Sequence, residues 1–161
     1  MNTVALSIRQ PWAWLIIHAG KDIENRSWPT RFRGPVLIHA SKGMTAQEYD
    51  AARRFLGTDS RLAAALRSLP PATELRRGGI VGECEIVGCV DGNDAASDSP
   101  WFMGNFGFML RGARPLEFRP CKGSLGFFDV GTQLDTPGYP ETTPTQPTPT
   151  QAQPCNPPSA T

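Results

Sequence analysis

The feature that most constrains this chain is the concentration of charged, polar and aromatic residues between positions 9 and 41. The stretch begins as Arg-Gln-Pro-Trp-Ala at 9–13, continues as Gly-Lys-Asp-Ile-Glu-Asn-Arg-Ser-Trp at 20–28 and ends as Arg-Gly-Pro-Val-Leu-Ile-His-Ala-Ser at 33–41. A hydrophobic core alone does not require so many charged groups in so short a space. The stretch therefore predicts a site that binds a polar, planar or anionic partner.

The spacing of apolar residues predicts an α+β domain. Trp12 and Leu15 recur at helical spacing before Gly20, which ends the first helix, and Thr45 with Glu48 forms a capping box for a second helix. A strand, a helix, two strands, two helices and a run of strands follow one another, which favours a sheet that curls into a small β-barrel flanked by helices. The predicted strands are 3–8, 22–28, 36–40, 80–90, 106–110, 116–118 and 125–130, and the predicted helices are 10–19, 45–56 and 59–69.

Composition separates this domain from a tail. The chain has 161 residues, and eight of its 16 prolines follow Leu134. We expect one domain over 1–133 and a disordered Pro/Thr/Gln-rich tail over 134–161, because such a tail buries too little apolar area to offset its ordering entropy. The tail could dock to another protein, but its composition favours a solvated terminus.

The formal net charge of +1 excludes a polycation, so any nucleic-acid contact must come from a local patch.

Cysteine spacing and hydropathy bear on the compartment. The four cysteines include no C-x-x-C pair, and both histidines lie far upstream, so we expect no zinc site and no cofactor. The N-terminus lacks the pattern of a signal peptide, and no stretch approaches the roughly 18 apolar residues of a membrane span. We therefore predict a cytoplasmic protein without a membrane partner, and the oligomeric state stays open.

Four separated pieces of the sequence resemble the ASCH domain family, in the family's order. They are 10–13, 20–28, 33–41 and the closing Lys-Gly-x-x-Gly-Phe-Phe-x-Val at 122–130. The resemblance implies a PUA-like β-barrel flanked by helices, with a cleft that binds RNA or a modified nucleoside. The family includes transcription-coactivator modules, an amidohydrolase acting on N4-acetylcytidine and proteins reported as ribonucleases, so membership alone does not imply one activity.

Three charged residues and a tryptophan are the main candidates for the site. Lys21 follows Gly20, where its ammonium can hold a phosphate or a carbonyl oxygen, or act as a base if burial lowers its pKa. Glu24 and Arg26 alternate onto one strand face, where they can accept from an amino group and bind phosphate or a base edge. Trp28 suits stacking on a nucleobase. The competing interpretations are a solvated lysine, a surface ion pair and a tryptophan that packs at the rim.

The other ligand-binding candidates are Gln10, Trp12, His39 and Ser41. Gln10 lies near a helix N-terminus and can read a base edge, whereas Trp12 heads the apolar stripe and suits the core. His39 and Ser41 share a strand face and can donate to phosphate, although a buried histidine bonded to a main-chain carbonyl is commoner. A group of basic residues could form a rim around the site, although such a group is more often a solvated face; its members are Arg31, Arg33, Lys42, Arg76 and Arg77.

Aromatic residues also occur late in the chain, in a loop that is either a lid over the cleft or a hydrophobic lock that closes the barrel. They are Trp101, Phe102 and Phe106.

An enzyme needs a nucleophile that this chain does not plainly display. The amidohydrolase relatives keep Lys21 and Arg26 but have a threonine, the proposed nucleophile, where this chain has Glu24. Glu85 is the best counterpart of their distant glutamate, with Glu83 as its rival. A ribonuclease could instead bind a divalent metal through Glu24 and Glu85, or Glu24 and Glu83. We predict a protein that binds RNA or a modified nucleoside; the alternative is a hydrolase of either kind, with Lys21, Glu24 and Glu85 as its catalytic residues.

Overall fold

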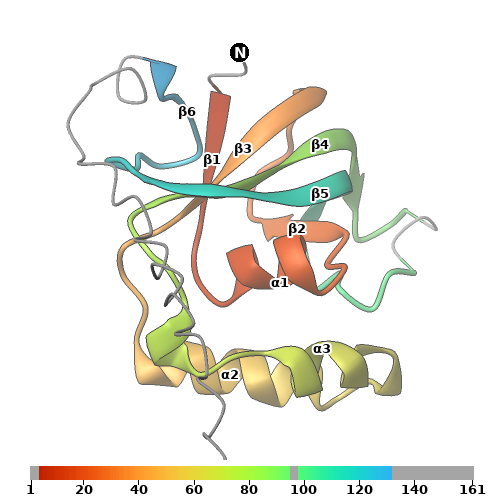
Figure 1. Cartoon of the computed structure of the whole chain (residues 1–161). Helices are drawn as coiled ribbons and strands as arrows, with labels where there is room; N and C mark the ends of the chain where they lie inside the picture. The colour runs from red at the N-terminus through yellow and green to blue at the C-terminus, as the bar shows by residue number, and fades with distance from the viewer. Residues whose placement is uncertain (1–3, 95–97, 132–161) are drawn as a thin grey trace, which may run out of the picture.

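The computed structural model describes residues 4–94 and 98–131, which form a curled six-stranded sheet with three α-helices (Figure 1). The strand order is β2-β5-β4-β3-β1-β6, and within the described ranges the end strands do not pair with each other. The predicted α+β class is confirmed, and the sheet is a half-barrel rather than a closed barrel. The strands are β1 Val4–Ile8, β2 Ile23–Arg26, β3 Gly34–Ala40, β4 Gly79–Asp91, β5 Phe106–Pro120 and β6 Phe127–Asp129, and the helices are α1 Trp12–His18, α2 Ala46–Leu56 and α3 Ala63–Ser68.

Two of the sequence predictions concern residues that the structure does not describe. The domain boundary after 133 and the tail over 134–161 lie outside the described residues. Within the described ranges, no helix has both the length and the apolar character that crossing a bilayer requires.

The first core lies inside the curl of the sheet. Leu6 and Ile8 of β1 and Ile38 of β3 point into it and meet Ile86 and Phe108 from β4 and β5. Strand β3 pairs with β1 in parallel and with β4 in antiparallel orientation, and its last five residues are buried. The continuous apolar run predicted for this strand therefore reflects its central position.

Helix α1 sits against the inner side of the curl, between the sheet and the layer formed by α2 and α3 (Figure 1). Ile17 packs so closely on β4 that a Cβ on Gly82 would overlap it and lie 2.6 Å from the Arg114 carbonyl oxygen. A second core fills the space between α1 and the outer helices, with Leu15 and Leu56 among its members. The helix thus has apolar contacts on two sides.

The predicted capping box is present, since the Thr45 side chain accepts from the Glu48 N–H and the Glu48 carboxylate accepts from the Thr45 N–H. The predicted break between strands 106–110 and 116–118 is wrong, because β5 runs through both. Gly112 has a φ of 64° within it, next to register shifts against β4. The chain therefore passes this Gly as an irregularity in the ladder instead of as a turn.

Candidate functional site

Lys21 is placed by the turn that ends α1. Gly20 has a φ of 70°, which an L side chain rarely adopts, and the Lys21 N–H donates to the Leu15 carbonyl at 3.1 Å. This turn sends the chain back beneath the helix. The Lys21 side chain is 1% exposed as a result, so the solvated interpretation of this lysine is wrong.

The Lys21 ammonium lies near two indole rings. Its nitrogen is 5.6 Å from the centroid of the Trp12 ring and 5.8 Å from that of Trp101. It donates to the main-chain carbonyl of Ile23 and lies 3.8 Å from a Glu24 carboxylate oxygen. Burial lowers the pKa of Lys21, and the nearby Glu24 carboxylate partly opposes that shift.

Glu24 and Arg26 project together from β2, as the strand alternation predicts. Their carboxylate and guanidinium are 3.2 Å apart, with the side chains 9% and 18% exposed. Arg26 also donates to the Ser7 carbonyl at 2.7 Å, whereas its buried Nε has no partner in the described part of the chain. We call Lys21, Glu24 and Arg26 the ionic cluster.

The segment 98–103, which follows β4, places Trp101 next to Lys21. Asn25 faces away from Glu24 and holds the loop from both sides: its amide nitrogen donates to the Trp101 carbonyl, and its oxygen accepts from the Met103 N–H, both at 2.8 Å. Trp101 is 5% exposed and packs near Phe55. Its packing matches the hydrophobic-lock interpretation.

Two candidates are engaged in packing and capping. The buried Gln10 side chain donates to the Arg76 carbonyl at 2.8 Å and accepts from the Trp14 N–H at 3.0 Å, so its amide is used within the chain. The Trp28 ring makes edge contacts with Phe108 and Phe127, at centroid distances of 5.1 and 5.9 Å. Trp28 thus packs inside the half-barrel near β6. The aromatic rings next to Lys21 are those of Trp12 and Trp101 instead.

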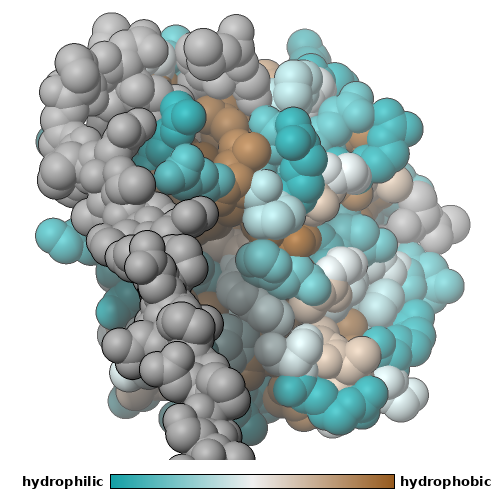
Figure 2. Space-filling view, viewed as in Figure 1, coloured by the Kyte–Doolittle hydropathy of each residue, from teal (hydrophilic) through white to brown (hydrophobic). Residues whose placement is uncertain are grey.

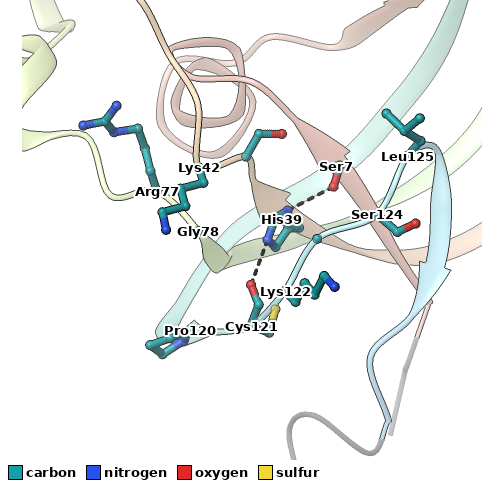
Figure 3. Close-up of a pocket in the computed structure, with 12 residues that line it drawn as sticks. Ser7, His39, Lys42, Arg77, Gly78, Pro120, Cys121, Lys122, Ser124 and Leu125 are labelled. Atoms are coloured by element: carbon teal, nitrogen blue, oxygen red, sulfur yellow. Dashed lines mark hydrogen bonds between the residues drawn. The ribbon is translucent and has the colours of Figure 1, made fainter.

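His39 is held in one orientation. Its Nε2 lies 3.2 Å from the Cys121 carbonyl oxygen and its Nδ1 lies 3.0 Å from the Ser7 hydroxyl (Figure 3). Because a carbonyl only accepts, Nε2 carries the hydrogen and Nδ1 accepts from Ser7. Burial also lowers the pKa of His39, which favours this neutral form. The commoner interpretation, a buried histidine bonded to a main-chain carbonyl, is confirmed.

A cavity of about 900 Å³ opens beside His39, at the ends of β1, β3 and β5 (Figure 3). Ser41 lines it, as do three basic side chains, and none of its described lining residues is acidic. The ionic cluster does not line it. We call this space the basic cavity; its basic residues are Lys42, Arg77 and Lys122.

Glu85 does not join the ionic cluster. On β4, Cys84 faces the inner core, so the residues on either side face outward. Glu85 pairs with Arg111 at 2.8 Å, and Glu83 pairs with Arg114. The proposed pairing of Glu24 with Glu85 is therefore wrong, and within the described residues no three His, Cys, Asp or Glu side chains form a group that could hold a metal.

Cys84 is buried in the inner core next to the ionic cluster. Burial, with the carboxylates of Glu24 and Glu83 adding to it, raises the pKa of the Cys84 thiol to about 12. The thiol therefore stays protonated at neutral pH. It contributes packing to the inner core next to the ionic cluster.

Sequence reasoning missed Ser7. It touches both regions, since its carbonyl accepts from Arg26 while its hydroxyl bonds to His39 and lines the basic cavity. A serine between Leu6 and Ile8 in an apolar strand was the available signal. Trp101 was named only as a lid or lock, because nothing local connects it to Lys21.

The fold and the site define a small α+β domain in which a buried lysine, glutamate and arginine meet at strand β2 of a curled sheet. The chain belongs to the ASCH domain family, whose model matches residues 6–102. No curated protein matches it significantly. Strand β6, at Phe127–Asp129, lies beyond the matched stretch and still pairs with β1, so the folded domain extends past it.

Proposed function

We propose that this ASCH domain binds RNA or a modified nucleoside, with a base held at the ionic cluster. The observation that carries the proposal is the unmatched hydrogen-bonding capacity of buried groups. The Arg26 Nε–H has no acceptor in the described part of the chain, and the Lys21 ammonium has one close carbonyl partner. Such groups are costly to bury unless something completes them.

The donors and the acceptor of the cluster suit the edge of an amino-bearing pyrimidine. Lys21 and Arg26 can donate to its carbonyl oxygen and ring nitrogen, while the Glu24 carboxylate can accept from its amino group. The Trp12 and Trp101 rings near Lys21 offer stacking surfaces. Since Trp101 packs next to Lys21, binding of a base there requires Trp101 to be displaced from its packed position.

A hydrolase is a second proposal, supported by one observation. Burial lowers the pKa of Lys21, which is what a lysine that acts as a base requires. The chain has Glu24 where an amidohydrolase would present a hydroxyl. A reaction would therefore need water as the nucleophile, and conversion of N4-acetylcytidine to cytidine by the purified protein tests it directly.

The binding proposal is tested by calorimetric titration with cytidine, N4-acetylcytidine and a short single-stranded RNA. Lys21→Met is the informative variant, because methionine keeps most of the volume and leaves Glu24 paired with Arg26. We expect the wild type to bind and Lys21→Met to lose binding while unfolding cooperatively. Equal binding by both proteins would overturn the assignment of the base to the cluster.

We also propose that the protein acts without a cofactor and in the cytoplasm. The thiols of Cys84, Cys89 and Cys121 are free, which suits a reducing compartment. Binding that is unchanged by a metal chelator is the expected result. A requirement for added divalent metal would contradict it.

A further inference from the structure

We propose that the basic cavity binds a phosphodiester group of a single-stranded RNA. The cavity is separate from the ionic cluster, and Lys42, Arg77 and Lys122 are among the residues that line it. The inference rests on the proposed function in taking RNA as the partner, but it does not require a base to bind at the cluster.

Two of the basic side chains are available to a ligand. Lys42 and Arg77 are exposed, and neither has an ion pair or a side-chain hydrogen bond within the described residues. On β5, by contrast, the exposed Arg111 and Arg114 are paired with glutamates. The positive charges of Lys42 and Arg77 are therefore uncompensated within the described residues, which favours an anion.

The floor of the cavity adds no negative charge. Both ring nitrogens of His39 are hydrogen-bonded, one to the Ser7 hydroxyl and the other to the Cys121 carbonyl. The imidazole that lines the cavity is therefore neutral and fixed in orientation. Gly123 lies directly on the imidazole, because a Cβ there would overlap the His39 ring. This close approach brings the main chain of 122–125 to the cavity, and the N–H groups of Gly123 and Ser124 have no acceptor in the described ranges. Main-chain N–H groups in a Gly-containing loop are common phosphate donors.

The volume and the position of the cavity favour a strand over a free phosphate ion. About 900 Å³ leaves room for more than a phosphate ion, including a sugar–phosphate unit. Ser7 lines the cavity with its hydroxyl, and its carbonyl accepts from Arg26 of the ionic cluster. Ser7 thus adjoins both sites, and we place a neighbouring phosphate of the same strand in the cavity. Figure 2 shows, on the face seen in Figure 1, a mostly hydrophilic described surface on which hydrophobic residues form small groups.

The test is the salt dependence of RNA binding. A fluorescent oligouridylate is titrated with the whole protein over a range of KCl concentrations, for the wild type and for the double variant Lys42→Gln with Arg77→Gln. Each phosphate contact on a single strand contributes about 0.7 to the slope of log affinity against log salt, so the double variant should lose roughly 1.4. Arg53→Gln with Arg54→Gln, two exposed arginines of α2, is the matched control and should keep the wild-type slope.

The outcomes separate this inference from the proposed function. An unchanged slope in the double variant, or an equal loss in the control, would overturn the phosphate site. Competition by inorganic phosphate or uridine monophosphate as strong as that by the oligonucleotide would overturn the strand in favour of a small phosphate ligand. Lys21→Met should keep the dependence of the slope on Lys42 and Arg77, even where nucleoside binding is lost, so failure of one site does not imply failure of the other.

Discussion

The Arg26 guanidinium donates to the main-chain carbonyl of Ser7 at 2.7 Å and so joins β2 to β1, two strands that are separated by β5, β4 and β3 in the sheet. The half-barrel is thus held across its open side by a side chain. Arg26 also lies 3.2 Å from Glu24, so the same group serves the curl of the sheet and the ionic cluster.

Arg26→Ala should lower the free energy of unfolding by about 2–3 kcal/mol, because it removes the contact with Ser7 and leaves Glu24 with a weaker counter-charge. Urea denaturation measures the loss. Arg111→Ala is the control, since Arg111 and Glu85 form an exposed pair whose side chains are 70% and 44% exposed. That change should cost no more than about 0.5 kcal/mol. Equal losses in the two variants would contradict the bridging role of Arg26.

Glu24 and Lys21 should respond differently to substitution. Glu24→Gln leaves the buried Lys21 and Arg26 without a carboxylate and should cost about 3 kcal/mol. Lys21→Met removes one buried charge, leaves Glu24 paired with Arg26, and should cost less than about 1.5 kcal/mol. Urea denaturation of both variants gives the order, and a greater loss for Lys21→Met would contradict this account of the cluster.

Gly123→Ala should destabilise the domain by about 1–3 kcal/mol, because the new Cβ would overlap the His39 ring and force a shift. Gly43→Ala is the matched control, since a Cβ there meets nothing within 4 Å. Its effect should stay within about 0.5 kcal/mol. Thermal unfolding compares the two, and a neutral Gly123→Ala would show that the loop does not rest on the imidazole.

Acid should destabilise the domain through His39. Burial lowers its pKa in the folded state below the ordinary 6.5, so between these two values the unfolded chain binds more protons than the folded one. Stability should therefore rise with pH through this window and be lost as the pH falls below about 6.5. Burial lowers the pKa of His18 as well, which adds a contribution of the same sign.

The contribution of His39 can be isolated with His39→Gln. The variant should show a flatter dependence of unfolding free energy on pH between about 5 and 7, above the range in which most carboxylates titrate. His18→Gln, measured in the same way, separates the contribution of the second histidine. A wild-type slope in His39→Gln would contradict the neutral, buried state assigned to this ring.

Local sequence signals were sufficient for part of the site. Gly20 ends a helix and the next residues alternate along a strand, so the neighbourhood of Lys21, Glu24 and Arg26 follows from spacing alone. The same alternation holds on β4, where Glu83 and Glu85 face outward on either side of Cys84. It could not say that this face points away from Glu24, because that depends on how β4 sits in the sheet.

Contacts between distant segments were beyond local reasoning. Trp101 reaches Lys21 only because Asn25 holds its loop, and both depend on the pairing of β2 with β5. The basic cavity is assembled from the ends of several strands and from the segment 121–125. Lys42 and Arg77 were recognisable as basic residues, but their convergence depends on the three-dimensional fold.

The most direct test of the central claim is a titration with N4-acetylcytidine and cytidine, followed by the tryptophan indole N–H signals in proton–nitrogen NMR spectra. Trp12 and Trp101 flank Lys21, whereas Trp14 lies against His18 and serves as an internal reference. We predict saturable shifts of the Trp12 and Trp101 signals, a steady Trp14 signal, and loss of the shifts in Lys21→Met. Signals of Trp12 and Trp101 that stay fixed at saturating nucleoside concentrations would contradict the claim that the ionic cluster holds a base.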